Sequence, residues 1–251
     1  MCCIDAVRDS IAGPAAKELA AHRSSDITMM LSLDMHPTSK KLAVRIAPKP
    51  APRSVSQPSR GFGAAYFRKF YHDPATRVVT SREMRNRATL IAALLNHLQI
   101  PIRSILDAGC GIGLLRRPFA AVLPRARYTG LEFSEYLCRR YGWRQGSVAG
   151  YAARKPFDLL VCYDVLQYLD DEEAARAIGN MARLTRAALY VSALTREDWL
   201  ENCDRSRTDR AVHLRSGAWY RRRLGKAFNY VGFGVWLRKD VTAVLWDMER
   251  A

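Results

Sequence analysis

Long apolar runs and closely spaced cysteines are missing from this 251-residue sequence. No apolar run approaches the roughly 18 residues that a membrane-spanning helix needs, so we expect no membrane span. The six cysteines include no C-x-x-C pair, which argues against a zinc site or a disulfide framework. Scattered cysteines of this kind favour reduced thiols in the cytoplasm, and we expect no metal site.

Acidic residues are also scarce, because 24 Asp and Glu face 40 Lys and Arg, giving a formal net charge of +16. Most of this excess lies after residue 60. Residues 215–226 contain no acid, and their cations are Arg215, Arg221, Arg222, Arg223 and Lys226. Such a block is more often a solvated helix face than a ligand site. It is also compatible with RNA, an acidic membrane surface or an anionic substrate.

Residues 1–60 differ in composition from the rest of the chain. Five prolines fall between positions 37 and 60, and positions 36–60 contain no Asp or Glu. We therefore expect a linker without regular structure at 36–60, and a poorly ordered extension over 1–60 as a whole. The segment from Met35 is similar in composition to a transit peptide, and a start at Met29, Met30 or Met35 is an open alternative.

Residues 61–251 are predicted to form the ordered domain, with a helical part at 61–100 and an α/β core at 101–251. The predicted strands are 104–108, 127–132, 143–146, 157–163 and 187–193. The predicted helices are 81–98, capped by Ser81, and 113–122, 134–141, 171–184 and 216–227. Continuous apolar runs such as 159–161 are typical of parallel strands buried on both faces. Residues 234–240 and 241–247 are predicted as a closing antiparallel hairpin, which makes seven strands in an α/β fold.

Three glycines at alternate positions, Gly109, Gly111 and Gly113, follow the first predicted strand. This pattern indicates a tight turn whose backbone approaches a ligand. Dinucleotide sites have the spacing G-x-G-x-x-G, whereas Leu114 stands here where the third glycine would be. Asp107 precedes the glycines and would repel a pyrophosphate. It suits a ligand that carries an amino group beside a carboxylate.

The segment Leu-Asp-Ala-Gly-Cys-Gly-Ile-Gly at 106–113 resembles the class I S-adenosylmethionine-dependent methyltransferases, and the resemblance extends to Asp247. It implies a three-layer Rossmann-like fold and S-adenosylmethionine as cofactor, with Asp107 orienting its methionine part. Glu132 matches the acid that holds the two ribose hydroxyls, since one carboxylate can accept both hydrogen bonds. Ser147 stands where the family usually has an acid near the adenine. The implied cofactor residues are Asp107, Gly109, Cys110, Gly111, Gly113, Glu132, Phe133, Ser134, Ser147, Val148, Cys162 and Tyr163.

Methyl transfer depends mainly on placement, because the sulfonium is already a good leaving group. A base is needed only if the acceptor must lose a proton. Asp164 is the leading candidate, since it ends the strand that faces the methyl group in the family; a turn-capping aspartate is an equally good interpretation. Tyr163, Tyr168 and His213 are further candidates, with a structural role favoured for His213. Val165 is interpreted as packing.

A long polar segment, 195–220, follows the fifth predicted strand, at the edge of the sheet where substrates bind in such folds. Aromatic residues also recur at helical spacing between positions 62 and 71, and of these Phe62 and Phe70 are interpreted as core. The predicted substrate residues are Tyr66, Tyr71, Tyr168, His213, Arg215, Trp219 and Tyr220.

The sequence thus predicts a methyltransferase that acts on a small molecule, with an anionic acceptor as one option. One alternative is an RNA or protein methyltransferase that uses the basic face at 215–226. A second is an NAD-linked oxidoreductase, which the glycine spacing disfavours. A third is a non-catalytic cofactor-binding protein, which Ser147 leaves open. The sequence identifies neither the acceptor nor the oligomeric state.

Overall fold

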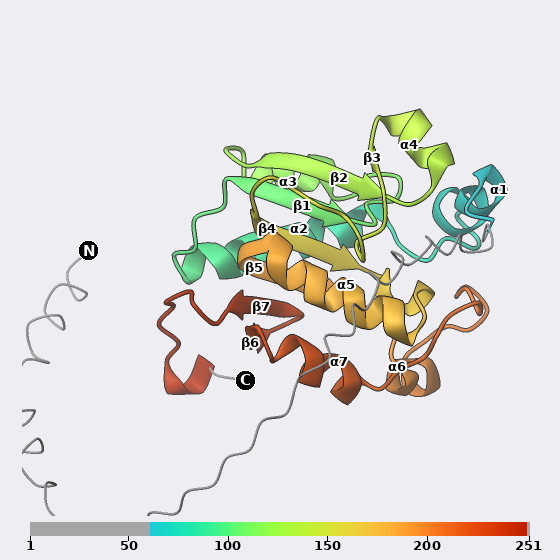
Figure 1. The fold of residues 1–251 in the computed structure, drawn as a ribbon. Helices are drawn as coiled ribbons and strands as arrows, with labels where there is room; N and C mark the ends of the chain where they lie inside the picture. The colour runs from blue at the N-terminus through green and yellow to red at the C-terminus, as the bar shows by residue number, and fades with distance from the viewer. Residues whose placement is uncertain (1–60, 250–251) are drawn as a thin grey trace, which may run out of the picture. The chain divides into compact units, whose positions relative to one another are not determined.

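The structure, a computed structural model, describes residues 61–249, so the extension expected at 1–60 lies outside the described residues. Its centre is one seven-stranded sheet with the order β3-β2-β1-β4-β5-β7-β6 (Figure 1). Strands β1 to β5 pair in parallel, and β7 runs antiparallel to both β5 and β6. The strands are β1 Ser104–Ala108, β2 Arg127–Glu132, β3 Arg144–Gln145, β4 Phe157–Tyr163, β5 Thr185–Ser192, β6 Phe228–Gly232 and β7 Val235–Arg238. The predicted fold class is confirmed.

Helices cover both faces of this sheet, which gives three layers (Figure 1). The α-helices are α1 Ala64–Phe67, α2 Ser81–His97, α3 Arg116–Val122, α4 Glu135–Tyr141, α5 Asp171–Leu184, α6 Arg196–Glu201 and α7 Gly217–Leu224. Short turns of other helix types are η2 Arg68–His72, η3 Leu166–Tyr168 and η4 Asp247–Glu249. Helix α6 lies within the polar segment for which no helix was predicted.

Successive strand residues face opposite helical layers, which is why the central strands are apolar throughout. On β1, Ile105 packs with residues of α2 and α3, whereas Leu106 packs with residues of α5 and α7. Both side chains are almost fully buried. Each such burial contributes about 1.5–3 kcal/mol relative to an exposed side chain. The two cores hold the carboxyl ends of the parallel strands in fixed positions.

The start of α2 corrects the predicted N-cap by one residue. The Thr80 hydroxyl accepts a hydrogen bond from the backbone N–H of Glu83, and the Glu83 carboxylate accepts one from the Thr80 N–H. This capping box requires Glu three residues after the cap, a spacing that Thr80 meets and Ser81 does not. Before α2, helix α1 continues directly into η2, a π-helical turn.

The closing hairpin lies earlier in the chain than predicted. It consists of β6 and β7, joined through Phe233 and Gly234, whose φ angles are +49° and +80°. Residues 241–246 form no strand, although alternate residues there pack against the α2 side of the core. The predicted strand at 234–240 contains β7, whereas the predicted strand at 241–247 is wrong. The partner of β7 is β6, which precedes it, so Gly234 lies in the turn of the hairpin and not at its start.

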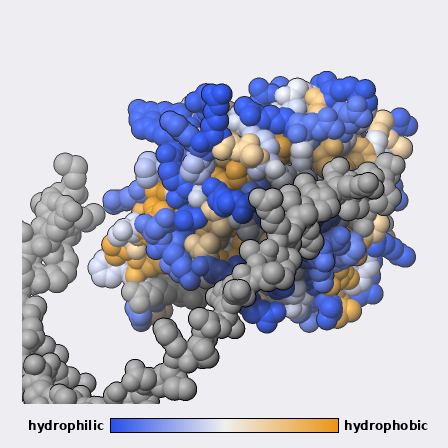
Figure 2. Space-filling view, viewed as in Figure 1, coloured by the Kyte–Doolittle hydropathy of each residue, from blue (hydrophilic) through white to orange (hydrophobic). Residues whose placement is uncertain are grey.

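The face shown in Figure 2 is mostly hydrophilic, with apolar residues in separate patches. Within the described part of the chain, no helix has the length and apolar character to cross a membrane.

Candidate active site

A cavity of about 460 Å³ lies at the carboxyl ends of β1 to β4. The parallel strands point toward α1 in Figure 1, and residues of α1 and η2 form the opposite wall of the cavity. Ligands bind at this edge of open α/β sheets, where the strand order reverses, here between β1 and β4. The cavity is lined by Phe62, Tyr66, Phe67, Tyr71, Gly109, Gly111, Glu132, Phe133, Gly146, Ser147, Val148, Asp164, Val165, Tyr168, Leu169 and Glu173.

The three loop glycines serve different purposes. A Cβ on Gly109 would lie 2.2 Å from Val165 Cγ2, and one on Gly113 would lie 2.6 Å from Trp143 Cζ2, so both positions are closed by side chains. A Cβ on Gly111 would find no atom nearer than 3.9 Å, because this glycine faces the cavity. All three have positive φ, between +55° and +80°. Gly111 therefore leaves room for a ligand, whereas Gly109 and Gly113 make tight packing possible.

Glu132, at the end of β2, connects the glycine loop to the start of α4. Its Oε2 accepts a hydrogen bond from the Gly111 N–H at 2.8 Å, and its Oε1 accepts one from the Ser134 N–H at 2.8 Å. Burial raises the pKa of this carboxyl group, while these backbone hydrogen bonds oppose the shift. Ser134 itself is buried, caps α4 and donates to the Phe62 carbonyl, so it positions the loop and the aromatic wall instead of lining the cavity.

Asp107 lies below the glycine loop and does not line the large cavity. Its carboxyl group accepts a hydrogen bond from the Tyr128 hydroxyl on the neighbouring strand. Burial raises the pKa of Asp107 to about 7, against the opposing effect of the Tyr128 hydrogen bond. The structure places Asp107 beside a small space of about 30 Å³ that it shares with Gly109, Cys110 and Gly111.

A second cavity, of about 330 Å³, adjoins the large one. Four residues line both cavities: Tyr66, Tyr71, Asp164 and Tyr168. The hydroxyls of Tyr66 and Tyr168 lie 2.9 Å apart, which joins the α1 wall to the turn after β4. Because these residues separate the two spaces, a group passed from one ligand to another would cross here.

Asp164 follows β4 and has a φ of +55°, a conformation that few non-glycine residues adopt. Burial raises the pKa of its carboxyl group, and hydrogen bonds with Tyr163 and Gln167 and the charge of Arg87 oppose the shift. Tyr163 lines the second cavity and the space of about 30 Å³ beside Asp107, and it does not line the large cavity. The Arg87 guanidinium lies 4.0 Å from the centre of its ring. Burial raises the pKa of Tyr163 too, so this phenol is protonated at neutral pH.

Several predicted site residues lie elsewhere. Cys162 is completely buried on the α5 side of the sheet, and Cys110 is buried under the loop. His213 is exposed and lines neither cavity. Val165, interpreted as packing, and Phe62, interpreted as core, both line the large cavity. Phe70, also interpreted as core, is buried and lines the small cavity.

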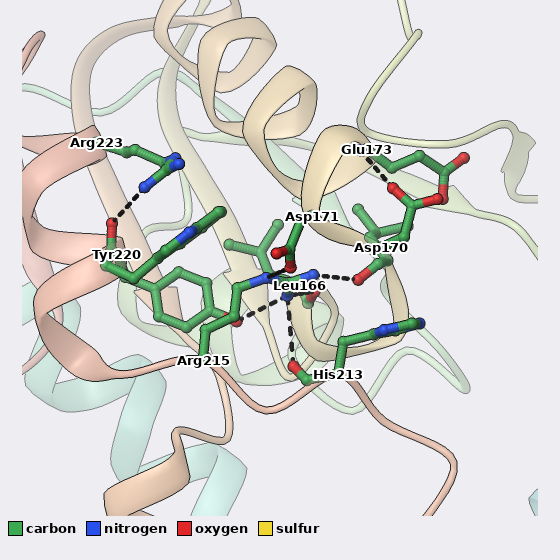
Figure 3. A network of polar contacts seen from close by, with 10 residues as sticks. Leu166, Asp170, Asp171, Glu173, His213, Arg215, Tyr220 and Arg223 are labelled. Atoms are coloured by element: carbon green, nitrogen blue, oxygen red, sulfur yellow. Dashed lines mark hydrogen bonds and ion pairs between the residues drawn. The ribbon is translucent and has the colours of Figure 1, made fainter.

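Arg215 was predicted to contact substrate, but the structure buries it in a polar network (Figure 3). Its guanidinium donates to the carbonyls of Leu166 at 3.0 Å and Leu169 at 2.6 Å, and to the Asp171 carboxylate at 2.7 Å. Its donors are used to hold η3, so they are directed away from both cavities. Two other predicted substrate residues, Trp219 and Tyr220, contact this same guanidinium and line neither cavity.

Some residues that shape the site were missed by the sequence analysis. Trp143 donates a hydrogen bond to the Gly111 carbonyl at 2.9 Å and packs against Gly113, which fixes the loop from outside. Asn180, on α5, donates to the carbonyls of Val148 and Tyr151 and holds the loop after β3. A buried Asn on the apolar face of a predicted helix was the one signal in the sequence that pointed to such a contact.

The lining of the large cavity is acidic and rich in aromatic residues. Glu132, Asp164 and Glu173 contribute carboxyl groups, and the described lining residues include no Lys or Arg. Such a lining suits a cationic sulfonium and gives no cation for a pyrophosphate. Together with the space left by Gly111, the residues present fit S-adenosylmethionine.

Comparisons with known proteins agree with this geometry. Residues 106–187 match a family model described as a methyltransferase domain. No curated protein matches the sequence.

Solved structures share the fold. Magnesium protoporphyrin IX methyltransferase (ChlM) from Synechocystis PCC 6803, with bound SAH, is 20% identical with a TM-score of 0.51, over 70% of this chain and 94% of that one. N-methyltransferase NodS from Bradyrhizobium japonicum WM9, in complex with S-adenosyl-l-homocysteine, is 18% identical with a TM-score of 0.50. The alignment covers 70% of this chain and 97% of NodS. DesVI from Streptomyces venezuelae is 22% identical with a TM-score of 0.41, and the alignment spans 46% of this chain and about half (53%) of DesVI.

At these identities the structural likeness establishes the fold, and the family model adds a match over residues 106–187. The match begins at Leu106, within the strand that leads into the glycine loop, and ends within β5. The described residues therefore have the Rossmann-like fold of the methyltransferases ChlM and NodS, and residues 106–187 within it match the methyltransferase-domain model.

Proposed function

We propose that this protein transfers the methyl group of S-adenosylmethionine to a small-molecule acceptor. The observation that carries the proposal is the wall of the large cavity, where Gly111, Glu132 and Ser147 come together from three different strand ends. Gly111 leaves space for the methionine part, and Glu132 offers carboxylate oxygens for the ribose hydroxyls. Ser147 supplies no negative charge near the adenine, so backbone groups of Ser147 and Val148 would serve there.

Methyl transfer from a sulfonium requires few catalytic groups from the protein. When bound, the cofactor supplies a methyl group on a sulfonium that needs no further activation. The protein orients the acceptor, excludes water and, where the acceptor carries a proton, removes it. Asp164 is the proposed base because it lies on the boundary of both cavities and because burial raises the pKa of its carboxyl group. We do not assign this role to His213, which lines neither cavity.

The alternatives have less support at the site. Arg221 and Arg222 of α7 are exposed, and Arg223 lies 3.7 Å from the ring centre of Trp219; none of the three lines either cavity. An RNA or protein substrate that docks on the 215–226 face would therefore meet a surface away from the reacting groups.

The four described cysteines are free, which supports the proposal of a reducing compartment such as the cytoplasm.

Calorimetry with S-adenosylhomocysteine tests the proposal. We expect micromolar binding by the wild type and about 10- to 100-fold weaker binding by Glu132→Gln, which replaces one acceptor oxygen by a donor. The matched control is Glu135→Gln, an exposed carboxylate on the neighbouring α4, which should bind as the wild type does. A folded wild type without affinity for S-adenosylhomocysteine, or equal affinity in the wild type and Glu132→Gln, would contradict the proposal.

A further inference from the structure

The small cavity is acidic, although the chain as a whole is strongly basic. Three carboxyl groups line it, those of Asp164, Asp198 and Asp209, and its described lining residues include no Lys or Arg. The sequence carries a net charge of +16, so a cavity with this lining is unlike the average surface. The three acids come from different parts of the fold, namely the end of β4, helix α6 and the loop after it.

These carboxyl groups remain available to a ligand. None of the three forms a salt bridge with a described residue. The Asp198 carboxylate accepts hydrogen bonds from Thr195 and Asn202, and the Thr195 bond holds its pKa below the usual range, so it is charged at neutral pH. The charge of Arg87 lowers the pKa of Asp164, but Arg87 stacks on Tyr163 and does not line the cavity.

The side chain of Gln167 contains a buried hydrogen-bond acceptor without a donor. Gln167 is 4% exposed and lines the small cavity, its amide donates toward Asp164, and its Oε1 has no hydrogen-bond partner. Leaving such an atom unsatisfied costs about 1–3 kcal/mol in a folded protein. The missing partner is a hydrogen-bond donor, because an amide oxygen can only accept.

Aromatic rings form a further part of the lining. Tyr66, Phe70, Tyr71, Tyr163 and Tyr168 all border the small cavity. The faces of such rings attract cations, and rings combined with carboxylates are a favourable environment for an ammonium group. An anionic acceptor, the option suggested by the basic block at 215–226, would instead meet three carboxyl groups.

We propose that the small cavity binds the methyl acceptor and selects one that carries a protonated amino group. This rests on the proposed function, which makes the large cavity the cofactor site. Asp198 and Asp209 accept the hydrogen bonds of the ammonium. Asp164, on the boundary, takes one of its protons: an N–H bond breaks, its electron pair stays on nitrogen, and an O–H bond forms on the carboxylate. The nitrogen then has the lone pair that a methyl acceptor needs.

Three small probes that share a phenyl ring and a short chain test the charge preference. They are 2-phenylethylamine, 2-phenylethanol and 3-phenylpropanoate, titrated against the full chain by ligand-observed NMR with and without S-adenosylhomocysteine. We expect the amine to bind at least about tenfold more tightly than the alcohol, and the carboxylate most weakly. Equal binding of the three, best binding by the carboxylate, or no binding of the amine would overturn the proposal.

Substitutions of the lining carboxylates test whether the preference for the amine arises in the small cavity. Asp209→Asn keeps an oxygen for the hydrogen bond that Asp209 accepts from the Ala211 N–H. It should weaken amine binding by about threefold to tenfold and leave alcohol binding unchanged. Asp198→Asn should act in the same direction, whereas Asp240→Asn, an exposed acid after β7, should change nothing. An amine preference that survives in the Asp198→Asn, Asp209→Asn double variant would place the ammonium elsewhere and overturn the assignment.

The two proposals fail in different ways. If S-adenosylhomocysteine does not bind, the proposed function is wrong, and the charge preference of the probes is still measured without it. If S-adenosylhomocysteine binds and the probes show no preference for the amine, the cofactor assignment stands and the amino-group assignment is wrong.

Discussion

At the scale of single residues, Asp107 is the most consequential buried carboxyl group. In the unfolded chain its pKa is about 3.9, whereas burial raises the pKa of Asp107 to about 7 in the folded protein. The folded state therefore holds a proton that the unfolded state has released between these two values. Stability from this group is complete below pH 4 and is lost as the pH rises toward 7. A difference of this size corresponds to a few kcal/mol at most, about 1.4 kcal/mol per pKa unit.

We predict that Asp107→Asn removes this pH dependence. The amide oxygen can still accept the hydrogen bond from Tyr128, and the side chain cannot ionise. In urea unfolding, the variant should match the wild type near pH 4.5 and exceed its unfolding free energy by roughly 2–4 kcal/mol at pH 8. Two parallel curves of unfolding free energy against pH would show that Asp107 is not the group responsible.

The opposite change at the partner residue provides the control. Tyr128→Phe removes the hydrogen bond that lowers the pKa of Asp107, so that pKa should rise further. The wild-type loss of stability with pH should then extend to higher pH and become larger. A Tyr128→Phe variant with less pH dependence than the wild type would contradict the role given to this hydrogen bond.

Residues were predictable from the sequence where a local pattern defined them. Gly111 was predicted from the glycine spacing and Glu132 from the resemblance to the methyltransferase family, and both line the large cavity. The burial of Arg215 was not predictable, because its acceptors are backbone carbonyls more than 40 residues away. Backbone carbonyls occur in every sequence, so no residue pattern marks the ones that an arginine will reach.

At the scale of elements, Arg215 attaches the segment after α6 to η3. The turn η3 carries Gln167 and Tyr168, which line the small cavity, and Arg215 binds the carbonyls on both sides of them. Its side chain is 4% exposed, whereas that of its partner Asp171 is 76% exposed. Arg215 is therefore a positioning residue, and its planar fork matters more than its charge.

We predict that Arg215→Lys destabilises the fold and loosens the site. Lysine keeps the charge but cannot reach both carbonyls and Asp171 together, so the unfolding free energy should fall by about 2–4 kcal/mol. Binding of 2-phenylethylamine should weaken more than binding of S-adenosylhomocysteine, since η3 contributes more residues to the small cavity. Arg221→Lys, an exposed position on α7, should alter neither. Loss of stability with unchanged amine binding would limit Arg215 to a structural role.

Elements with a strong apolar pattern were predicted almost to the residue, and those defined by turns were not. The bounds of β1, β2 and β4 agree with prediction because each is an apolar or β-favouring run with a clear end. The hairpin was misplaced because alternation at 241–245 arises from irregular chain packed on the core. Helix α6 was missed because its six residues bury no side chain completely, so no apolar face marks it.

At the scale of the whole molecule, charge is separated between surface and interior. The sequence carries 40 basic residues, yet both cavities at the carboxyl edge of the sheet are lined by carboxyl groups and by no described Lys or Arg. Composition alone suggested an anionic ligand, because it averages over the surface. The distribution became visible only when the fold brought strand ends, α1 and the segment around α6 together.

This arrangement predicts which adenosine-containing cofactor stabilises the protein. A ligand that binds only the folded state adds RT ln(1 + [L]/Kd), about 2.7 kcal/mol at 100 times Kd. For a domain of this size, that raises the midpoint of thermal unfolding by roughly 5–10 °C. S-adenosylmethionine should produce this shift in a concentration-dependent way, as measured by differential scanning fluorimetry, and the shift should be smaller in Glu132→Gln. NADH should produce none, since its pyrophosphate would meet Glu132, Asp164 and Glu173. A larger shift with NADH than with S-adenosylmethionine would reverse the cofactor assignment.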